Sequence, residues 1–235
     1  MNKKPELKYI LPNLFTAGSI FVSIISVVYA YNERFIDAGW LIVLSAILDG
    51  LDGRVARLTG TQSKFGVEFD SLADIISFGV APSLLFFFVA GKDYGKIGVF
   101  LTAIFIVLGA IRLARFNVTT KDIHPNIFIG LPIPSAALFV VSWIMLANEY
   151  ELALNLLIGG FIFFAGVLMV SNIRYPSFKK IDFGNQRNLK ILVLIVILLG
   201  LIYTCSVLSL WLIFNSYVFF GFFRASYLLI KKRKT

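Results

Sequence analysis

Long apolar runs, each about the length of a membrane-spanning helix, alternate with short polar segments along this chain. A helix that crosses the hydrocarbon core of a bilayer needs about 20 mostly apolar residues. Eight runs approach that length, at residues 14–31, 36–58, 67–90, 96–116, 133–148, 152–171, 189–206 and 208–230. The pattern therefore predicts an all-α, polytopic integral membrane protein with about eight transmembrane helices.

Composition excludes the other broad classes of protein. Hydrophobic residues make up 58% of the chain and charged residues only 15%, whereas about a quarter of the residues in a soluble domain are charged. A water-soluble fold could not hide so much apolar surface, and so many aliphatic and aromatic residues exclude disorder. We expect one domain over residues 1–235, with residues 2–12 forming an interfacial helix on the membrane surface.

The distribution of Lys and Arg predicts the orientation in the membrane. With a cytoplasmic N-terminus, 19 of the 22 basic residues lie in or beside cytoplasmic segments, which is the usual bias. The opposite side receives Arg34, Lys92 and Lys96. We therefore expect a cell-membrane protein with both termini in the cytoplasm. Its net charge of +9 suits anionic lipid head groups, and no nucleic-acid partner is expected because the basic residues are spread over loops.

Four aspartates interrupt the apolar pattern between the second and third runs. Charged groups inside membrane helices are costly and usually functional. Asp49 and Asp52 share one helix face, as do Asp70 and Asp74, because residues three or four apart lie on the same side. The intervening residues allow a tight antiparallel turn, so the two carboxylate pairs are expected to converge. Helix capping with salt bridges to neighbouring arginines is the purely structural alternative.

Carboxylates this close repel one another unless cations lie between them. The chain has a single Cys205 and a single His124, so a metal here would be held mainly by oxygen ligands, as Mg²⁺, Mn²⁺ and Ca²⁺ prefer. Two such ions side by side form a site suited to phosphoryl transfer. Arg57, one helical turn from Asp52 and Gly53, is suitably placed for a phosphate group. The pattern thus favours metal-assisted phosphoryl chemistry.

The spacing D-x2-D-G-x2-A-R-x8-G-x3-D-x3-D runs from Asp49 to Asp74 with every fixed position present. It resembles the signature of the CDP-alcohol phosphatidyltransferases, which are polytopic membrane enzymes. The resemblance implies transfer of a phosphatidyl group from a CDP-linked lipid to an alcohol, with release of CMP. It also implies divalent metal ions as cofactors, two of Mg²⁺ or Mn²⁺, and a homodimer.

The same resemblance implies a role for each matched residue. The metal ligands would be Asp49, Asp52, Asp70 and Asp74, and Asp74 would also be the catalytic base that takes the alcohol proton. The segment LPNLFT at 11–16 also looks like the entry to the first helix in this family, where polar groups face the nucleotide. The residues that bind the CDP-lipid would be Asn13, Thr16, Asp52, Gly53, Ala56, Arg57, Gly66 and Asp70.

Three further segments are similar to the branch of this family that makes phosphatidylserine. They are RLARFN at 112–117, GLPIPS at 130–135 and SNIRYPSFK at 171–179. This similarity implies L-serine as the acceptor and CDP-diacylglycerol, or an ether-lipid equivalent, as the donor. A serine carboxylate suits an arginine fork, while its ammonium or hydroxyl suits a polar neutral group. The candidate acceptor-binding residues are Arg112, Arg115, Asn117, Ser135 and Arg174.

Two other functions stay open at the level of sequence. A sister transferase that uses glycerol 3-phosphate or an inositol phosphate would also need arginines, and the arginines could instead anchor helices at lipid phosphates. A cation transporter could use the aspartates as an ion pathway. Against transport, the acids lie near one side of the membrane, and Arg57 belongs to the same cluster.

Overall fold

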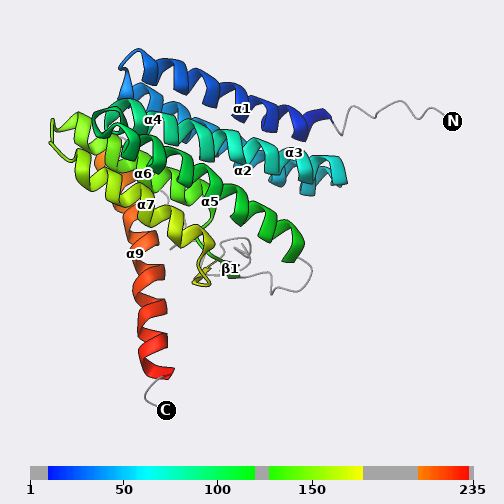
Figure 1. Ribbon diagram of the computed structural model, residues 1–235. Helices are drawn as coiled ribbons and strands as arrows, with labels where there is room; N and C mark the ends of the chain where they lie inside the picture. The colour runs from blue at the N-terminus through cyan, green and yellow to red at the C-terminus, as the bar shows by residue number, and fades with distance from the viewer. Residues whose placement is uncertain (1–9, 120–126, 177–205, 233–235) are drawn as a thin grey trace.

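The computed structural model describes residues 10–119, 127–176 and 206–232, which form a bundle of helices (Figure 1). The all-α prediction is confirmed. The helices are α1 (Ile10–Tyr31), α2 (Phe35–Thr59), α3 (Lys64–Asp74), the π-helix η2 (Ile75–Val80), α4 (Ala81–Val89), the 3₁₀ turn η3 (Gly91–Tyr94), α5 (Lys96–Thr119), α6 (Ile133–Glu149), α7 (Asn155–Val170) and α9 (Ser206–Lys232).

Four of the described segments are long and apolar enough to cross a membrane: Pro12–Tyr31, Lys64–Val89, Lys96–Thr119 and Ser206–Ala225. The second of these joins α3, η2 and α4 into one continuous rod. α6 and α7 are shorter apolar helices of 17 and 16 residues. α2 has 25 residues but carries the charged residues of the motif.

Two predicted segments lie outside the described residues. The apolar run at 189–206 does so except for its last residue, which begins α9. The count of eight membrane helices therefore stays a prediction. Most of the expected interfacial helix at 2–12 also lies outside, and its last three positions already belong to α1.

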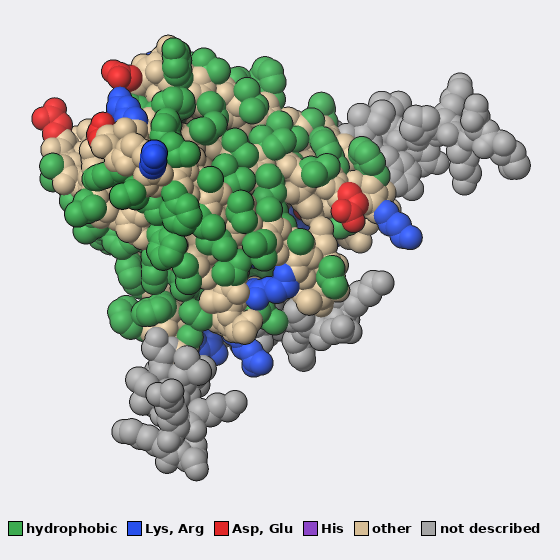
Figure 2. Space-filling model, in the orientation of Figure 1, with side chains coloured by type: hydrophobic (Ala, Val, Ile, Leu, Met, Phe, Trp, Pro, Cys, Tyr) green, Lys and Arg blue, Asp and Glu red, His purple; other side chains and the backbone are tan. Residues whose placement is uncertain are grey.

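Apolar side chains cover the middle of the face shown in Figure 2, and the charged side chains lie toward its edges. Large hydrophobic residues on the outside of the bundle include Phe21, Phe100 and Leu156, which are 68%, 56% and 78% exposed. A contiguous apolar surface of this kind is stable against lipid tails and unstable against water. The structure thus describes an integral membrane protein.

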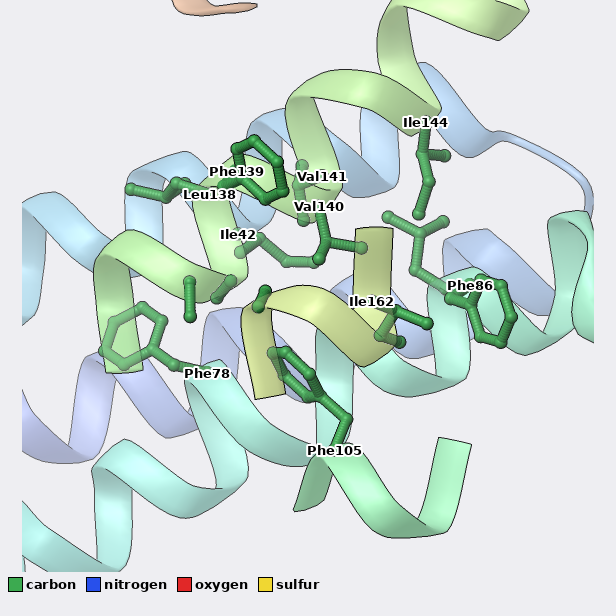
Figure 3. Packing of buried hydrophobic residues seen from close by; sticks show 14 of the residues in the cluster. Ile42, Phe78, Phe86, Phe105, Leu138, Phe139, Val140, Val141, Ile144 and Ile162 are labelled. Carbon is green, nitrogen blue, oxygen red and sulfur yellow. The ribbon is translucent and has the colours of Figure 1, made fainter. Parts of the chain in front are cut away.

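α6 forms the centre of the bundle. Its residues Phe139, Val140 and Val141 are fully buried, and α6 packs against α2, α4, α7 and α9. Gly39 of α2 lies so close to α6 that a Cβ there would overlap the side chain of Met145. Around α6 the core is filled by residues from each neighbouring helix, among them Ile42, Phe78, Phe86, Phe105 and Ile162 (Figure 3).

The turn between α2 and α3 is fixed by a helix cap at each side. Gly60 ends α2 in the left-handed conformation, with φ at 64°, a conformation in which glycine avoids the strain that other residues incur. Ser63 caps α3, because its Oγ accepts a hydrogen bond of 3.0 Å from the N–H of Gly66. The C-terminal end of α2 therefore lies beside the N-terminal half of α3.

A π-helical turn, η2, follows directly after Asp74. Pro82, in the first turn of α4, has no N–H to donate to the carbonyl of Phe78. Such wide turns relieve a broken hydrogen-bond ladder and are frequent at functional sites. Here η2 lets the rod continue past the proline without a break in the chain.

The structure also contains a small antiparallel sheet that the hydropathy pattern did not predict. β1 (Ile127–Ile129) pairs with β2 (Arg174–Pro176), with Phe128 opposite Tyr175. Gly130, with φ at 77°, continues the pairing through its N–H, which donates to the carbonyl of Ile173 over 2.8 Å. The sheet joins the segment before α6 to the segment after α7.

Candidate active site

Three of the predicted metal ligands come together where α2 meets α3. Asp49 and Asp52 lie in the second half of α2, and Asp70 lies in α3. One carboxylate oxygen from each residue lies within 4.8 Å of the other two. This spacing suits carboxylates that share a divalent cation, since oxygen ligands bind Mg²⁺ or Ca²⁺ at about 2.0–2.6 Å. The turn at Gly60 thus produces the convergence that the sequence predicted.

Asp74 joins this cluster from the last turn of α3. Its carboxyl group lies within hydrogen-bonding reach of the carboxyl group of Asp49. Oδ1 of each residue is buried and has no hydrogen-bond partner within the described part of the chain. Two carboxylates approach so closely only when a proton or a cation lies between them, and an unpaired buried charge is costly. The four aspartates therefore fit a bound divalent metal.

Thr16 of α1 holds one of the acids in place. Its Oγ1 donates a hydrogen bond of 2.5 Å to Oδ2 of Asp52, and both residues are buried. Partners of this kind orient a metal-binding carboxylate and limit its rotamers. Thr16, which the family resemblance placed with the CDP-lipid, thus lies beside a predicted metal ligand.

Asn13 and Gly66 lie opposite each other where α1 meets α3. A Cβ at Gly66 would come within 3.5 Å of Oδ1 of Asn13 and 3.2 Å of Oγ of Ser63. Glycine thus avoids crowding between these two polar groups. Both residues predicted to bind the CDP-lipid are therefore close to each other and to the α2–α3 turn.

Gly53, Ala56 and Arg57 lie on the last two turns of α2. A Cβ at Gly53 would lie 3.5 Å from Nη1 of Arg57, so the guanidinium runs back along the helix over the glycine. Arg57 is exposed and interacts electrostatically with Asp52. The arrangement gives an exposed cation at the edge of the acidic cluster, suited to a phosphate group.

Arg112 of α5 lies on the other side of Asp74. It is 5% exposed, interacts electrostatically with Asp74, and places its guanidinium 5.6 Å from the ring centre of Phe116. Its Nε is buried without a hydrogen-bond partner among the described residues. Among the predicted acceptor residues, Arg112 is thus one that the fold brings within electrostatic range of Asp74.

Arg115, one turn later, binds protein oxygens instead. Its Nη1 donates to the carbonyl of Val170 and Oδ1 of Asn172, over 3.0 and 3.3 Å. Its Nη2 donates to the carbonyls of Ser171 and Ile129, over 3.0 and 3.4 Å. The guanidinium therefore holds the C-terminal end of α7 next to β1.

The other three predicted acceptor residues are spread around this end of the bundle. Nδ2 of Asn117 donates to Oγ of Ser71 over 3.0 Å and so links α5 to α3. Ser135 is half-buried in the first turn of α6, and Arg174 is exposed on β2.

Two tyrosines near Arg112 were missed by the sequence reasoning. Tyr217 of α9 interacts electrostatically with Arg112, and its ring centre lies 5.6 Å from that of Tyr175 on β2. Tyr175 belongs to the segment SNIRYPSFK, so the similarity of that segment was a signal for it. Tyr217 lies in an apolar run, where nothing in the pattern distinguishes it from its lipid-facing and core neighbours.

Known proteins place this site in a family. A model of the CDP-alcohol phosphatidyltransferase family matches residues 9–173. A CDP-diacylglycerol–serine O-phosphatidyltransferase of Helicobacter pylori (strain J99) is 50% identical over 226 residues, which cover 95% of this chain and 94% of the relative. A protein of the same name from Methanocaldococcus jannaschii is 39% identical over 68% of this chain and 74% of the relative. An archaetidylserine synthase of Methanothermobacter thermautotrophicus is 37% identical over 75% of this chain and 74% of the relative. The chain therefore belongs to the CDP-alcohol phosphatidyltransferase family.

Proposed function

We propose that this protein transfers the phosphatidyl group of CDP-diacylglycerol, or of an ether-lipid equivalent, to the hydroxyl of L-serine, giving phosphatidylserine and CMP. The observation that carries the proposal is the convergence of Asp49, Asp52 and Asp70 at one partly buried site, with the carboxyl group of Asp74 beside that of Asp49. L-serine is proposed as the acceptor because several relatives are named as serine O-phosphatidyltransferases. One of these relatives is 50% identical over almost the whole chain. The names of these relatives also support enzyme activity in phospholipid biosynthesis.

In this proposal Asp49, Asp52, Asp70 and Asp74 hold two divalent cations, Mg²⁺ or Mn²⁺. When bound, these ions withdraw charge from the diphosphate and stabilise CMP as it leaves. Thr16 keeps the Asp52 carboxylate in a fixed rotamer through its 2.5 Å hydrogen bond. The buried oxygens of Asp49 and Asp74, which have no partner in the described chain, support this assignment.

Asp74 is proposed as the general base. The serine Oγ forms a bond to the phosphorus that carries diacylglycerol, the bond from that phosphorus to the CMP oxygen breaks, and the hydroxyl proton passes to the Asp74 carboxylate. Asp74 is supported in this role by its position between Asp70, one turn earlier, and Arg112, with which it interacts. Arg112 would stabilise the charged form of Asp74 when the hydroxyl approaches.

The nucleotide is proposed to lie over the adjoining ends of α1, α2 and α3. Gly53, Ala56 and Gly66 leave room beside the helix backbones. Arg57 binds a phosphate, because the residue is exposed and interacts electrostatically with Asp52. Asn13 and Thr16 line the side formed by α1, and Asp52 and Asp70 take part through the metals.

The acceptor is proposed to bind on the α5 side of Asp74. Arg112 is the residue that we assign to the serine carboxylate, because it is buried next to Asp74 and its Nε has no partner in the described chain. Asn117, Ser135 and Arg174 are assigned to the remainder of this acceptor side. Arg115 supports the pocket indirectly and does not touch serine. Its guanidinium holds the end of α7 and the strand β1 in place.

We also propose a cell-membrane location with the site and both termini on the cytoplasmic side, and a homodimer of one-domain chains spanning residues 1–235. The charged residues support the orientation. The site lies at the end of the bundle where Arg112, Arg115 and Arg174 gather, and the ion pairs Arg34–Asp37 and Lys92–Glu33 belong to the opposite end.

Release of CMP tests the proposal directly. Purified protein would receive CDP-diacylglycerol and Mg²⁺ or Mn²⁺, with L-serine, glycerol 3-phosphate and inositol 1-phosphate offered separately. Release with serine alone supports the proposed reaction. Release only with one of the phosphorylated acceptors would replace serine and keep the metal site, and metal binding without release for any acceptor would favour cation transport.

A further inference from the structure

Three polar side chains from distant parts of the chain form a series of neighbours that leads to Asp74. Arg112 comes from α5, Tyr175 from β2 and Tyr217 from α9, and we refer to them together as the Arg112 cluster. Tyr217 interacts electrostatically with both of the others, and the two tyrosine rings lie 5.6 Å apart between centres. Arg112 in turn interacts with Asp74. The cluster therefore adjoins the proposed catalytic base.

Two donors in this cluster lack acceptors. Tyr175 is fully buried, and neither its Oη nor the Nε of Arg112 has a hydrogen-bond partner in the part of the chain that the structure describes. Burial raises the pKa of the Tyr175 phenol well above its ordinary value, so the hydroxyl keeps its proton and remains a donor. Buried donors are almost always paired in native proteins. The Nε–H of a guanidinium and a phenolic O–H, both without acceptors among the described residues, together suit an anionic ligand.

The fold holds Tyr175 in this position at close range. Gly221 of α9 lies directly against the ring, and a Cβ there would overlap several of its atoms. β2 contributes a second constraint, since Tyr175 is paired with Phe128 in the two-stranded sheet. The sheet is held by Arg115, which binds carbonyls on both sides of it. The tyrosine is thus placed by three separate elements rather than by its own loop.

We infer that Tyr175 and Tyr217 complete, together with Arg112, the subsite that binds the acceptor's carboxylate and so selects the acceptor. This inference rests on the proposed function and names the residues that give the acceptor site its specificity. One guanidinium with neutral phenols matches a planar monoanion, whereas a phosphate dianion calls for further positive charge. Arg115, the nearest arginine in sequence, already has its guanidinium bound to protein oxygens.

The position of the tyrosines in the chain agrees with such a role. The match to the family model ends at residue 173. Tyr175 and Tyr217 therefore both lie beyond the matched part of the chain, referred to below as the shared part. The shared part contains the aspartates, which act on the CDP-lipid. A choice between acceptors is expected to depend on residues outside the shared part. The two tyrosines are such residues, whereas Arg112 lies within the shared part.

Removal of the Tyr175 hydroxyl is the decisive test. In Tyr175→Phe the ring packing against Gly221 is kept, and we expect the KM for L-serine to rise about tenfold, while kcat and the KM for CDP-diacylglycerol change less than twofold. The matched control is Tyr150→Phe, which removes the hydroxyl of an exposed tyrosine at the opposite end of the bundle. An unchanged KM for serine in Tyr175→Phe would overturn the inference.

Gly221→Ala provides a second variant that keeps both hydroxyls but displaces the Tyr175 ring. We expect the ratio of kcat/KM for L-serine to kcat/KM for ethanolamine, which lacks the carboxylate, to fall about tenfold. Binding of the CDP-lipid should be retained. Unchanged discrimination would also count against the subsite. If the wild-type protein makes no phosphatidylserine, the proposed function itself fails; if it does and neither variant alters serine use, only the assignment of the tyrosines fails.

Discussion

The two halves of the proposed site are built in different ways. The half that would bind metal and nucleotide comes mainly from two consecutive helices, with its acids between Asp49 and Asp74 and one strong hydrogen bond from Thr16 of α1. The half that would bind the acceptor comes from α5, β2 and α9, whose residues Arg112, Tyr175 and Tyr217 are far apart in the sequence. One half is local and the other depends on the whole bundle.

This difference has consequences for what each half tolerates. The local half is fixed by one turn, through Gly60 and Ser63, so a substitution there acts on few contacts and mostly on chemistry. The dispersed half depends on the contact of α9 with α6 and on the anchoring of β1 and α7 by Arg115. Substitutions in it should change stability and acceptor binding together. The variants below separate these two behaviours.

The largest effect is expected from Asp74→Asn. The amide cannot accept the serine proton as a base, so we expect turnover to fall at least about a thousandfold. Binding of CDP-diacylglycerol should change little. It is measured by titration in the absence of serine, when no transfer to an acceptor can take place. Turnover like that of the wild type would remove Asp74 from the role of base.

Asp70→Asn should act on the metal instead. Loss of one carboxylate ligand is expected to lower Mn²⁺ affinity about a hundredfold and turnover by a similar factor. Mn²⁺ binding is measured by electron paramagnetic resonance, independently of activity. The matched control is Glu68→Gln, which neutralises an exposed acid on the same helix and should leave both quantities unchanged. An equal loss in both variants would mean that net charge, not ligation, is responsible.

Thr16→Val tests the support of the local half. It removes the hydrogen bond to Asp52 while keeping a side chain of the same shape, and Mn²⁺ affinity is expected to fall about tenfold. Thr59→Val, on the exposed end of α2, is the control. If the two variants bind Mn²⁺ equally well, the 2.5 Å hydrogen bond does not contribute to the metal site.

Arg115→Lys tests the dispersed half. Lysine cannot bind four oxygens in the same plane, so we expect a loss of about 1–3 kcal/mol in stability together with a several-fold higher KM for serine. Thermal unfolding in detergent and serine kinetics measure the two effects. Arg54→Lys, on the exposed surface of α2, should change neither. A higher KM at unchanged stability would instead indicate that Arg115 touches the acceptor.

The smallest effect is expected from Gly60→Ala. An alanine with φ at 64° is strained, so the free energy of unfolding should fall by about 1 kcal/mol. Because the turn still forms, serine KM should stay the same. Circular dichroism during heating checks the first expectation, and a change of acceptor preference in this variant would contradict the separation of the two halves.

The sequence by itself determined the membrane helices and the acidic centre. Hydropathy marks a spanning helix without reference to the rest of the fold, and Asp49, Asp52, Asp70 and Asp74 lie on helix faces that follow from a spacing of three or four residues. Only the tertiary structure decided which arginine lies near Asp74 and that Tyr217, which packs on Tyr175, lies near that arginine. Contacts between α5, β2 and α9 have no periodic trace in the sequence, because they depend on how whole helices pack, whereas residues on one helix face are neighbours by the geometry of the backbone alone.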